Sequence, residues 1–302
     1  MKDIIEVIEK SNIGRIEKDV SLSKYTTYKV GGKAKVIVYP KNVDALIKLM
    51  RIISINKVKY KVLGNGSNLL FSDKVFNGVI IKLSELNDVE FLGRGKIRVG
   101  AGYSLMKLSL LAAKKGLAGL EFASGIPGTI GGAVFMNAGA YKSDMGYIVK
   151  GVKVLTPDLK IITLENKEMN FHYRSSFLQT HRDYICLEVI LKLEKGDKNV
   201  LDDVIKERRK RRIESQPLEY PSAGSVFRNP EGLFAGKLIE DLGLKGKKIG
   251  GAQVSEKHAN FIINYKKAKS SDIKELIELV HDKVLEEYNV DMKVEQEFVN
   301  WE

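Results

Sequence analysis

Short apolar runs dominate the first two thirds of the chain, and longer amphipathic patterns replace them towards the C-terminus. Four runs have the length and β-branched content of strands: Ala34–Tyr39, Lys59–Gly64, Gly78–Leu83 and Lys96–Gly102. Two amphipathic stretches among them predict helices, one after the cap candidate Asn42 and one over Ser104–Gly116, which the glycine would end. Pro157 and Asp158 separate two further apolar runs and predict a hairpin.

The helical part follows a charged, glycine-bearing linker at residues 196–199. Helices are predicted over Val200–Glu214, Ala235–Leu244 and Lys269–Tyr288. The last of them carries a stripe of apolar residues at helical spacing, with Ser270 and Ser271 as cap candidates. Two short strands are predicted within 258–264 and 292–301. The whole pattern predicts an α+β fold with a strand-rich front and a helix-rich final third.

The stretch Phe122–Tyr141 has no charge and is as long as a membrane helix. Its five glycines, its proline and its polar residues are poor helix formers, so it predicts buried loops and turns in a soluble protein. Residues 1–19 carry charges throughout, which is not typical of a signal peptide. The lone Cys186 can form no internal disulfide, so we expect a buried thiol and a cytoplasmic location.

The 302 residues suggest two or three domains, and they carry a formal net charge of +12. Such a charge admits nucleic acid, anionic lipid or a phosphorylated small molecule as partner. The strongest basic cluster, Arg208–Arg212, would ring a helix, because successive helical residues point about 100° apart. No stacking aromatics are interleaved with it, and a solvated helix end explains it equally well.

A first glycine-rich loop could bind an anion. In "GNGSNL", Gly64 and Gly66 follow a predicted strand, and Ser67 and Asn68 add polar donors. Consecutive amides in such a loop form a nest for a negative charge. The third position of the dinucleotide fingerprint is Leu69, and the next strand follows too soon for the crossover of a Rossmann unit. An ordinary Asn-Gly turn is the alternative.

Two later segments strengthen the prediction that the first glycine-rich loop binds a ligand. The segment "SGIPGTIGG" holds four glycines that permit close backbone approach to a flat or phosphorylated ligand, although a tight crossing of buried chains is the alternative. Two such loops suit a long ligand with a pyrophosphate. The second segment, "YPSAGSVFRNP", sets Ser225 in a short loop closed by prolines. Most loop serines form hydrogen bonds only to water or to their own backbone, so this loop by itself does not indicate a function for its serine.

The segments "TTYKVGGKA", "GNGSNLL", "SGIPGTIGGAVFMNAGAY", "YRSSF" and "QPLEYPSAGSVFRNP", in this order and spacing, resemble the UDP-N-acetylenolpyruvoylglucosamine reductase family. The resemblance covers about residues 21–297 and is to the shorter type, which lacks a substrate-covering insertion. It implies an FAD-binding fold of the vanillyl-alcohol-oxidase (PCMH) type in two subdomains, plus a separate α+β substrate-binding domain. The expected bounds are 1–83 and 84–197 for the subdomains and 198–291 for the substrate domain, with a strand in 292–302 returning to the first subdomain.

The resemblance also implies an activity: reduction of the enolpyruvyl ether of UDP-N-acetylglucosamine to UDP-N-acetylmuramate for peptidoglycan, with non-covalent FAD and with NADPH as reductant. Ser225 would protonate the product carbon, since a carbon-centred enolate is basic enough to take a hydroxyl proton. Arg174 matches the family's arginine, whose fork can hold a carboxylate. Glu297 matches the family's glutamate, but Gln296 replaces the usual proline of "EPEV", so Glu295 remains an alternative.

The resemblance assigns further residues to the two ligands. The expected cofactor-binding residues are Tyr28, Gly31, Gly32, Gly64, Asn65, Gly66, Ser67, Asn68, Gly125, Ile126, Pro127, Gly128, Gly131, Gly132 and Arg174. The expected substrate-binding residues are Arg212, Asn229, Lys237 and Gln253. We expect a monomer with no metal, nucleic acid or membrane as partner, and no sequence feature decides the oligomeric state.

Other functions remain open at this stage. An acyl-transfer hydrolase could draw on four histidines, but "AGSVF" is not the G-x-S-x-G elbow, and no H-E-x-x-H spacing supports a metal hydrolase. A nucleic-acid-binding module would depend on the basic run alone. The strongest rival is another flavin oxidoreductase of the same FAD-binding fold, which would share the glycine loops but not the serine loop.

Overall fold

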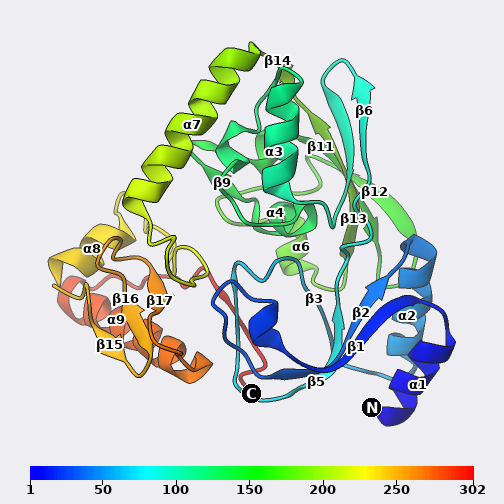
Figure 1. Ribbon diagram of the computed structural model, residues 1–302, viewed down its shortest axis with the longest axis horizontal. Coiled ribbons are helices and arrows are strands. Elements are labelled where there is room, and N and C mark those ends of the chain that lie inside the picture. The colour runs from blue at the N-terminus through cyan, green and yellow to red at the C-terminus, as the bar shows by residue number, and fades with distance from the viewer. The chain divides into compact units, whose positions relative to one another are not determined.

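The computed structural model describes residues 1–302, which form two compact units (Figure 1). Unit 1 consists of Met1–Lys18, Lys35–Asn65 and Asn77–Lys210. Unit 2 consists of Asp19–Ala34, Gly66–Phe76 and Arg211–Glu302. Segments far apart in the sequence therefore build each unit. The subdomain bounds expected from the sequence stay a prediction.

A four-stranded sheet has the order β1–β2–β5–β3. Its strands are β1 (Gly14–Ser21), β2 (Lys33–Pro40), β3 (Tyr60–Val62) and β5 (Phe76–Ile81). Strands β3 and β5 are parallel, with β4 (Leu69–Phe71) and loops in the connection between them. The pair is parallel, although the sequence predicted a connection too short for the crossover of a Rossmann unit. The connection still has no crossover helix, which distinguishes it from a dinucleotide-binding βαβ unit.

Two helices near the N-terminus pack together, α1 (Lys2–Lys10) and α2 (Val43–Ile55). The amide of Ala45 donates to Oδ1 of Asn42 at 2.9 Å, which confirms the predicted cap of α2. Helix α1 has buried Ile8 as its contribution to the core. We did not predict this helix, because charges interrupt its apolar pattern.

A second, five-stranded sheet has the order β12–β11–β13–β7–β6 and is antiparallel throughout. Its strands are β6 (Val89–Gly93), β7 (Lys96–Gly100), β11 (Val149–Leu155), β12 (Ile161–Glu165) and β13 (Ile185–Lys192). The predicted hairpin is confirmed as β11 and β12. Cys186 is buried in β13, as expected, and burial followed by the charge of Glu188 raises the pKa of its thiol to about 12.

Helix α3 (Leu105–Lys114) also confirms its prediction. The hydroxyl of Ser104 accepts from the amide of Lys107 at 3.3 Å, and Gly116 follows the helix with a φ of +69°. One large apolar core holds α3 and both sheets of unit 1 together. The small elements of this unit are β8 (Leu117–Ala118), η2 (Glu121–Ala123), β9 (Gly139–Ala140), β10 (Ser143–Asp144), α5 (Met145–Ile148), α6 (Phe177–Thr180) and β14 (Glu194–Lys195).

The prediction of loops and turns alone over residues 122–141 was wrong, because this stretch contains α4 (Ile130–Met136). The hydroxyl of Thr129 caps the helix by accepting from the amide of Gly132 at 3.3 Å. The buried side chains of Ile130, Ala133 and Val134 join the core of unit 1. Cap and burial together offset the low helix propensity of the two glycines in the first turn.

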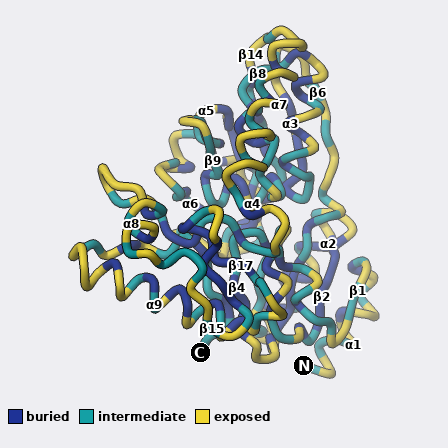
Figure 2. Tube along the Cα trace, turned by 60° about the vertical axis from the view of Figure 1, so that its left-hand side comes forward, coloured by how far each residue is buried: buried dark blue, intermediate teal, exposed yellow.

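Helix α7 (Lys198–Ser215) carries the chain from unit 1 into unit 2. Only Leu201 and Ile205 are buried along it, and Figure 2 shows the rest as mostly exposed. The residues of 208–212 are all exposed or half-buried, as expected for charges that ring a helix. None of the helices in the molecule has both the length and the apolar character that a membrane crossing requires.

Unit 2 is a small α+β layer. Strands β15 (Lys248–Ile249), β16 (Ala252–Val254) and β17 (Ile262–Asn264) form an antiparallel sheet, against which α9 (Ser270–Tyr288) packs (Figure 1). The apolar stripe of α9 is confirmed, with Ile273, Leu276, Ile277, Val280 and Val284 buried. Unit 2 also contains η1 (Leu22–Lys24), α8 (Ala235–Asp241) and β18 (Glu297–Val299), and β18 pairs in parallel with β4.

The predicted serine caps of α9 were wrong. The amides of Ser270 and Ser271 donate to the two carboxylate oxygens of Asp73, at 2.9 and 3.0 Å, and Asp73 follows β4 about 200 residues earlier. The carboxylate of Asp272 accepts from the amide of Lys269 at 2.9 Å. Burial opposes ionisation of Asp73, but these amide hydrogen bonds hold the pKa of its carboxyl below the ordinary value.

Candidate active site

The first glycine loop presents four consecutive backbone amides, those of residues 64–67, that donate no hydrogen bond within the protein. Gly66 has a φ of +61°, and a Cβ at this position would lie 2.3 Å from the carbonyl oxygen of Tyr25. Only glycine fits both conditions, so the curl of this loop depends on it. A run of unbonded amides in a curled loop fits an anion such as a diphosphate.

In unit 1 the first glycine loop meets the second. The side-chain amide of Asn65 donates to the carbonyl of Pro127 at 3.2 Å. A Cβ on Gly64 would lie 2.7 Å from Oγ1 of Thr129, so the two backbones approach as closely as glycine allows. Residues 125–132, which include the six expected cofactor residues of this segment, run from the loop into the first turn of α4. The structure thus brings together the two loops in which the sequence predicted a ligand cradle.

Lys82 is a cation at this loop that the sequence analysis missed. Its ammonium donates to the carbonyl of Gly64 at 2.6 Å, and its side chain is half-buried. Burial first, and then the charge of Arg15, lower the pKa of this lysine to about 8, while Glu17 acts in the opposite direction. The available signal was the single charge at the end of the apolar strand "GVIIK".

The expected cofactor-binding residues Tyr28, Gly31 and Gly32 make their contacts within unit 2. Tyr28 is 0 % exposed, and its hydroxyl donates to Oε1 of Gln296 at 2.9 Å. The amide of Gly32 donates to the carbonyl of Ser72 at 2.8 Å, and Gly31 lies against Leu22 and Phe71. A contact of these residues with a cofactor stays a prediction.

Arg174 lies at the tip of a tight turn in unit 1. Two backbone hydrogen bonds between His172 and Ser175, of 3.1 and 3.0 Å, close the turn, and Arg174 adopts a φ of +53°. Its Nη2 donates to the carbonyl of Gly139 at 3.0 Å, and its own carbonyl accepts from Gln179 at 2.9 Å. A left-handed backbone at a non-glycine residue costs free energy, and such strain is concentrated at functional sites.

Ser225 lies in a loop of unit 2 that hydrogen bonds hold from the residue directly after the serine. The next residue, Val226, donates its amide to the carbonyl of Asn260 at 2.9 Å and accepts from the amide of Glu295 at 2.7 Å. The side chain of Asn260 bonds both the amide and the carbonyl of Phe227, at 2.9 and 2.8 Å. The serine itself is half-buried. The sequence reasoning missed Asn260, whose signal was a polar residue inside the apolar run "HANFII".

The two candidate glutamates lie on one extended segment beside the serine loop. The carbonyl of Glu295 accepts from the side chain of Asn68 at 3.1 Å, and the amide of Glu297 donates to the carbonyl of Asn68 at 3.0 Å. Both glutamates are half-buried, whereas Gln296 between them is buried. The choice between them stays a prediction.

The expected substrate-binding residues all lie in unit 2. Oδ1 of Asn229 accepts from the amide of Ala235 at 3.1 Å and so caps α8. Lys237 pairs with Asp241 on the exposed side of α8, and hydrogen bonding to this carboxylate raises the pKa of the lysine. Gln253 is buried in β16, and Arg212 is half-buried near the end of α7. Their contact with a substrate stays a prediction.

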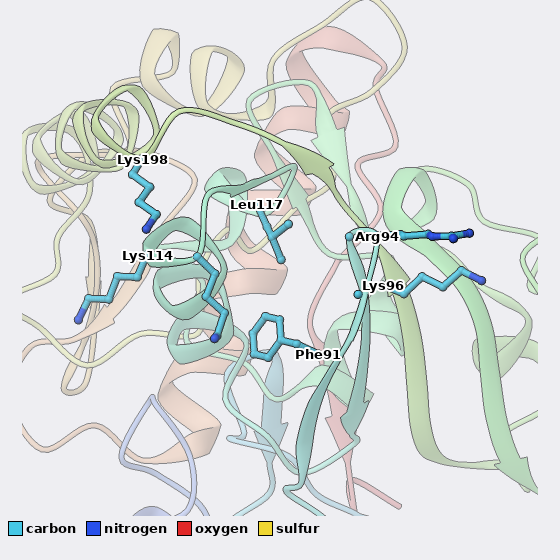
Figure 3. Close-up of a pocket in the computed structure, with 9 residues that line it drawn as sticks. Phe91, Arg94, Lys96, Lys114, Leu117 and Lys198 are labelled. Atoms are coloured by element: carbon cyan, nitrogen blue, oxygen red, sulfur yellow. The ribbon is translucent and has the colours of Figure 1, made fainter.

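A surface hollow of about 520 Å³ in unit 1 contains none of the predicted site residues (Figure 3). Phe91 and five basic residues line it: Arg94, Lys96, Lys114, Lys115 and Lys198. Figure 3 shows Arg94 and Lys96 pointing away from Phe91, whose ring lies 4.6 Å from the ammonium of Lys115. Lys114 and Lys115 end α3, where the helix dipole favours cations. Helix capping and solvation account for these charges.

No group of three or more His, Cys, Asp or Glu side chains is placed to hold a metal ion.

Comparisons with known proteins account for both units. Residues 34–165 match the family described as FAD binding domain, and residues 216–299 match UDP-N-acetylenolpyruvoylglucosamine reductase, C-terminal domain. UDP-N-acetylenolpyruvoylglucosamine reductase 1 of Bacillus cereus is 44% identical over 299 residues, which cover 99% of both chains. The UDP-N-acetylenolpyruvoylglucosamine reductase of Bacillus subtilis is 43% identical over 300 residues, again 99% of each chain.

Solved structures agree with these sequence matches. The crystal structure of UDP-N-acetylenolpyruvylglucosamine reductase from Thermus caldophilus has a TM-score of 0.81 and 36% identity, covering 94% of this chain and 99% of that one. BBE-like 1 of Physcomitrella patens has a TM-score of 0.51 and 16% identity over 64% of this chain and 44% of that one, which shows a shared fold alone. The expected fold class, with an FAD-binding domain of the PCMH type, is confirmed, and the chain belongs to the UDP-N-acetylenolpyruvoylglucosamine reductase family.

Proposed function

We propose that this protein reduces the enolpyruvyl ether of UDP-N-acetylglucosamine to UDP-N-acetylmuramate, a precursor of peptidoglycan, with NADPH as reductant. Bound FAD supplies the chemistry of hydride transfer between NADPH and the outer carbon of the enolpyruvyl group. The unbonded amides of the first glycine loop are the groups of this chain that would hold the FAD diphosphate. We further propose that the enzyme works as a monomer in the cytoplasm.

Three side chains then act on the substrate. Ser225 gives its hydroxyl proton to the inner carbon, where hydride addition leaves an enolate that is basic enough to take it. Arg174 binds the substrate carboxylate, into which the negative charge spreads, through its planar fork. Glu297 is the second acidic group, with Glu295 as the alternative on the same segment. Arg212, Asn229, Lys237 and Gln253 serve the diphosphate and sugar of the substrate.

The observation that supports this proposal best is the rigid setting of Ser225. A hydroxyl is a weak acid, so its contribution depends on being held in place before the reaction. The bonds of Val226 to Asn260 and Glu295 provide this, since they leave the adjacent serine little backbone freedom. The loop therefore supplies a proton donor whose ordering entropy is lost during folding and not during the reaction.

The test separates the two half-reactions of the flavin. We expect Ser225→Ala to leave anaerobic bleaching of the flavin by NADPH unchanged, and to slow its reoxidation by the enolpyruvyl sugar nucleotide by about 100- to 10,000-fold. Ser222→Ala, in the same loop, is the matched control and should behave as wild type. Wild-type reoxidation in Ser225→Ala would refute the proton-donor role. A reduced wild-type enzyme that the sugar nucleotide fails to reoxidise would instead favour another flavin oxidoreductase of this fold.

A further inference from the structure

Gln296 is buried, and its carboxamide makes hydrogen bonds in two directions. The side chain is 4 % exposed. Its Oε1 accepts from the hydroxyl of Tyr28 at 2.9 Å. Its Nε2 lies 3.3 Å from the carbonyl oxygen of Ala223, and 3.5 Å from those of Gly224 and Ser225. One amide group thus faces the three consecutive carbonyls that end at the serine.

The bond to Tyr28 decides which way this amide points. A tyrosine hydroxyl can donate to the oxygen of the carboxamide, and the Nε2 end then faces the loop carbonyls as their donor. Tyr28 is itself fixed, because it is fully buried and its backbone carbonyl accepts from the side chain of Asn264 at 3.0 Å. Burial raises the pKa of the Tyr28 phenol, and the bond to Gln296 opposes that shift, so the phenol stays protonated and remains a donor.

The loop at this point needs an external restraint. Gly224 has a φ of +77°, and a Cβ there would meet no atom within 4 Å, so packing does not hold the residue before the serine. Backbone hydrogen bonds hold the loop at Pro221, whose carbonyl accepts from the amide of Asn264 at 2.9 Å, and again from Val226 onward, but not at the residues between them. Ala223 is buried in the apolar core of unit 2, so the carboxamide of Gln296 is the polar group that restrains Gly224, between that residue and Val226.

We propose that Gln296 is a positioning residue for the proton donor, and that its Tyr28-oriented carboxamide sets the backbone of 223–225 and hence the place of the Ser225 hydroxyl. This inference builds on the proposed role of Ser225. A proline at this position, as in the family's usual "EPEV" segment, could not make these side-chain bonds. The backbone amide of Gln296 donates no hydrogen bond, so the backbone at this position, directly before β18, does not require a residue with an N–H.

The decisive variant is Gln296→Glu, which keeps the shape and the acceptor for Tyr28 and exchanges the donor for a carboxyl. Ionised, this carboxyl would face three carbonyl oxygens without a proton to donate. Protonated, it would donate as the amide does. Burial raises the pKa of such a carboxyl, so the exchange between the two forms falls at an accessible pH. Tyr28 is the titratable group bonded to the site, and Glu295 and Glu297 are its half-buried neighbours in sequence.

We expect reoxidation of the NADPH-reduced Gln296→Glu enzyme by the sugar nucleotide to be about 10- to 100-fold slower than wild type at pH 8, and to approach wild type as the pH falls to about 6. Gln296→Met, similar in size and without a donor, should be slow at both pH values and show a larger solvent isotope effect on this step. In both variants the rate of reduction by NADPH should be unchanged.

Two results would overturn the inference. One is wild-type reoxidation in both variants. The other is a result in which the variants slow both half-reactions to the same extent, lower the melting temperature, and do not regain their rates at low pH. That result would show a purely structural role. Ser225→Ala measured alongside separates the two proposals. If that variant turns over normally, the proton-donor role fails; if it stalls while both Gln296 variants behave as wild type, only the inference fails.

Discussion

Lys82 offers the sharpest quantitative test of the anion site proposed at the first glycine loop. Its pKa is lowered from the ordinary value of 10.5 to about 8. At about 1.4 kcal/mol per pKa unit, the half-buried ammonium costs the FAD-free protein roughly 3 kcal/mol of stability wherever it is charged. The lowered pKa sets the direction: the cost applies below pH 8 and disappears as the pH rises from about 8 to 10.5, so stability rises across that window.

An anion in the loop would favour the charged lysine and move its pKa back up. If FAD restores about half of the lost pKa, the gain is roughly 2 kcal/mol, or about 20-fold in Kd. We therefore expect Lys82→Met to bind FAD about 20-fold more weakly at pH 7 and yet to melt at a higher temperature without FAD. Wild-type affinity should be constant below about pH 8 and weaken above it, whereas that of Lys82→Met should not change with pH.

The assay is equilibrium titration of FAD-free protein by flavin fluorescence from pH 6 to 9.5, with thermal unfolding of the same samples. Lys41→Met removes an exposed lysine of unit 1 and is the control for loss of charge alone. Equal Kd values for Lys82→Met and wild type at pH 7, with the same pH dependence in both, would refute the assignment of Lys82 to the anion loop.

Two further predictions concern stability and the glycine cradle. Asp73→Asn should lower the free energy of unfolding by about 1 kcal/mol, because the carboxylate caps α9 through the amides of Ser270 and Ser271. Because the folded pKa of Asp73 is lowered, the wild-type advantage is present above its ordinary pKa of about 4 and is lost as the pH falls through the folded value; denaturant unfolding at pH 7 and pH 3 checks this, and an equal difference at both would contradict it. Gly64→Ala should weaken FAD binding by at least about 10-fold, since its Cβ would lie 2.7 Å from Oγ1 of Thr129, whereas Gly151→Ala, with nearest contacts of 3.4 and 3.6 Å, should bind normally. Equal affinities of the two alanine variants would contradict the cradle.

Sequence alone determined the elements whose signal is local. The cap Asn42, the helix within Ser104–Gly116, the hairpin at Pro157 and the apolar stripe of α9 were all confirmed, because each depends on residues within one or two turns of each other. The resemblance of the glycine and serine loops also led to the family, since these motifs combine rare residue types at fixed spacing. Helix α4 was missed because a poor helix former becomes helical once a cap and a core contact stabilise it.

Only the tertiary structure decided which distant groups meet. Asp73 caps a helix that begins nearly 200 residues later, Lys82 bonds the loop of Gly64, and Gln296 joins Tyr28 to the carbonyls before Ser225. No local pattern encodes these contacts, because hydrogen bonds between segments far apart in sequence depend on how whole layers pack. The chemistry of each motif is therefore readable from the chain, whereas its positioning is a property of the fold.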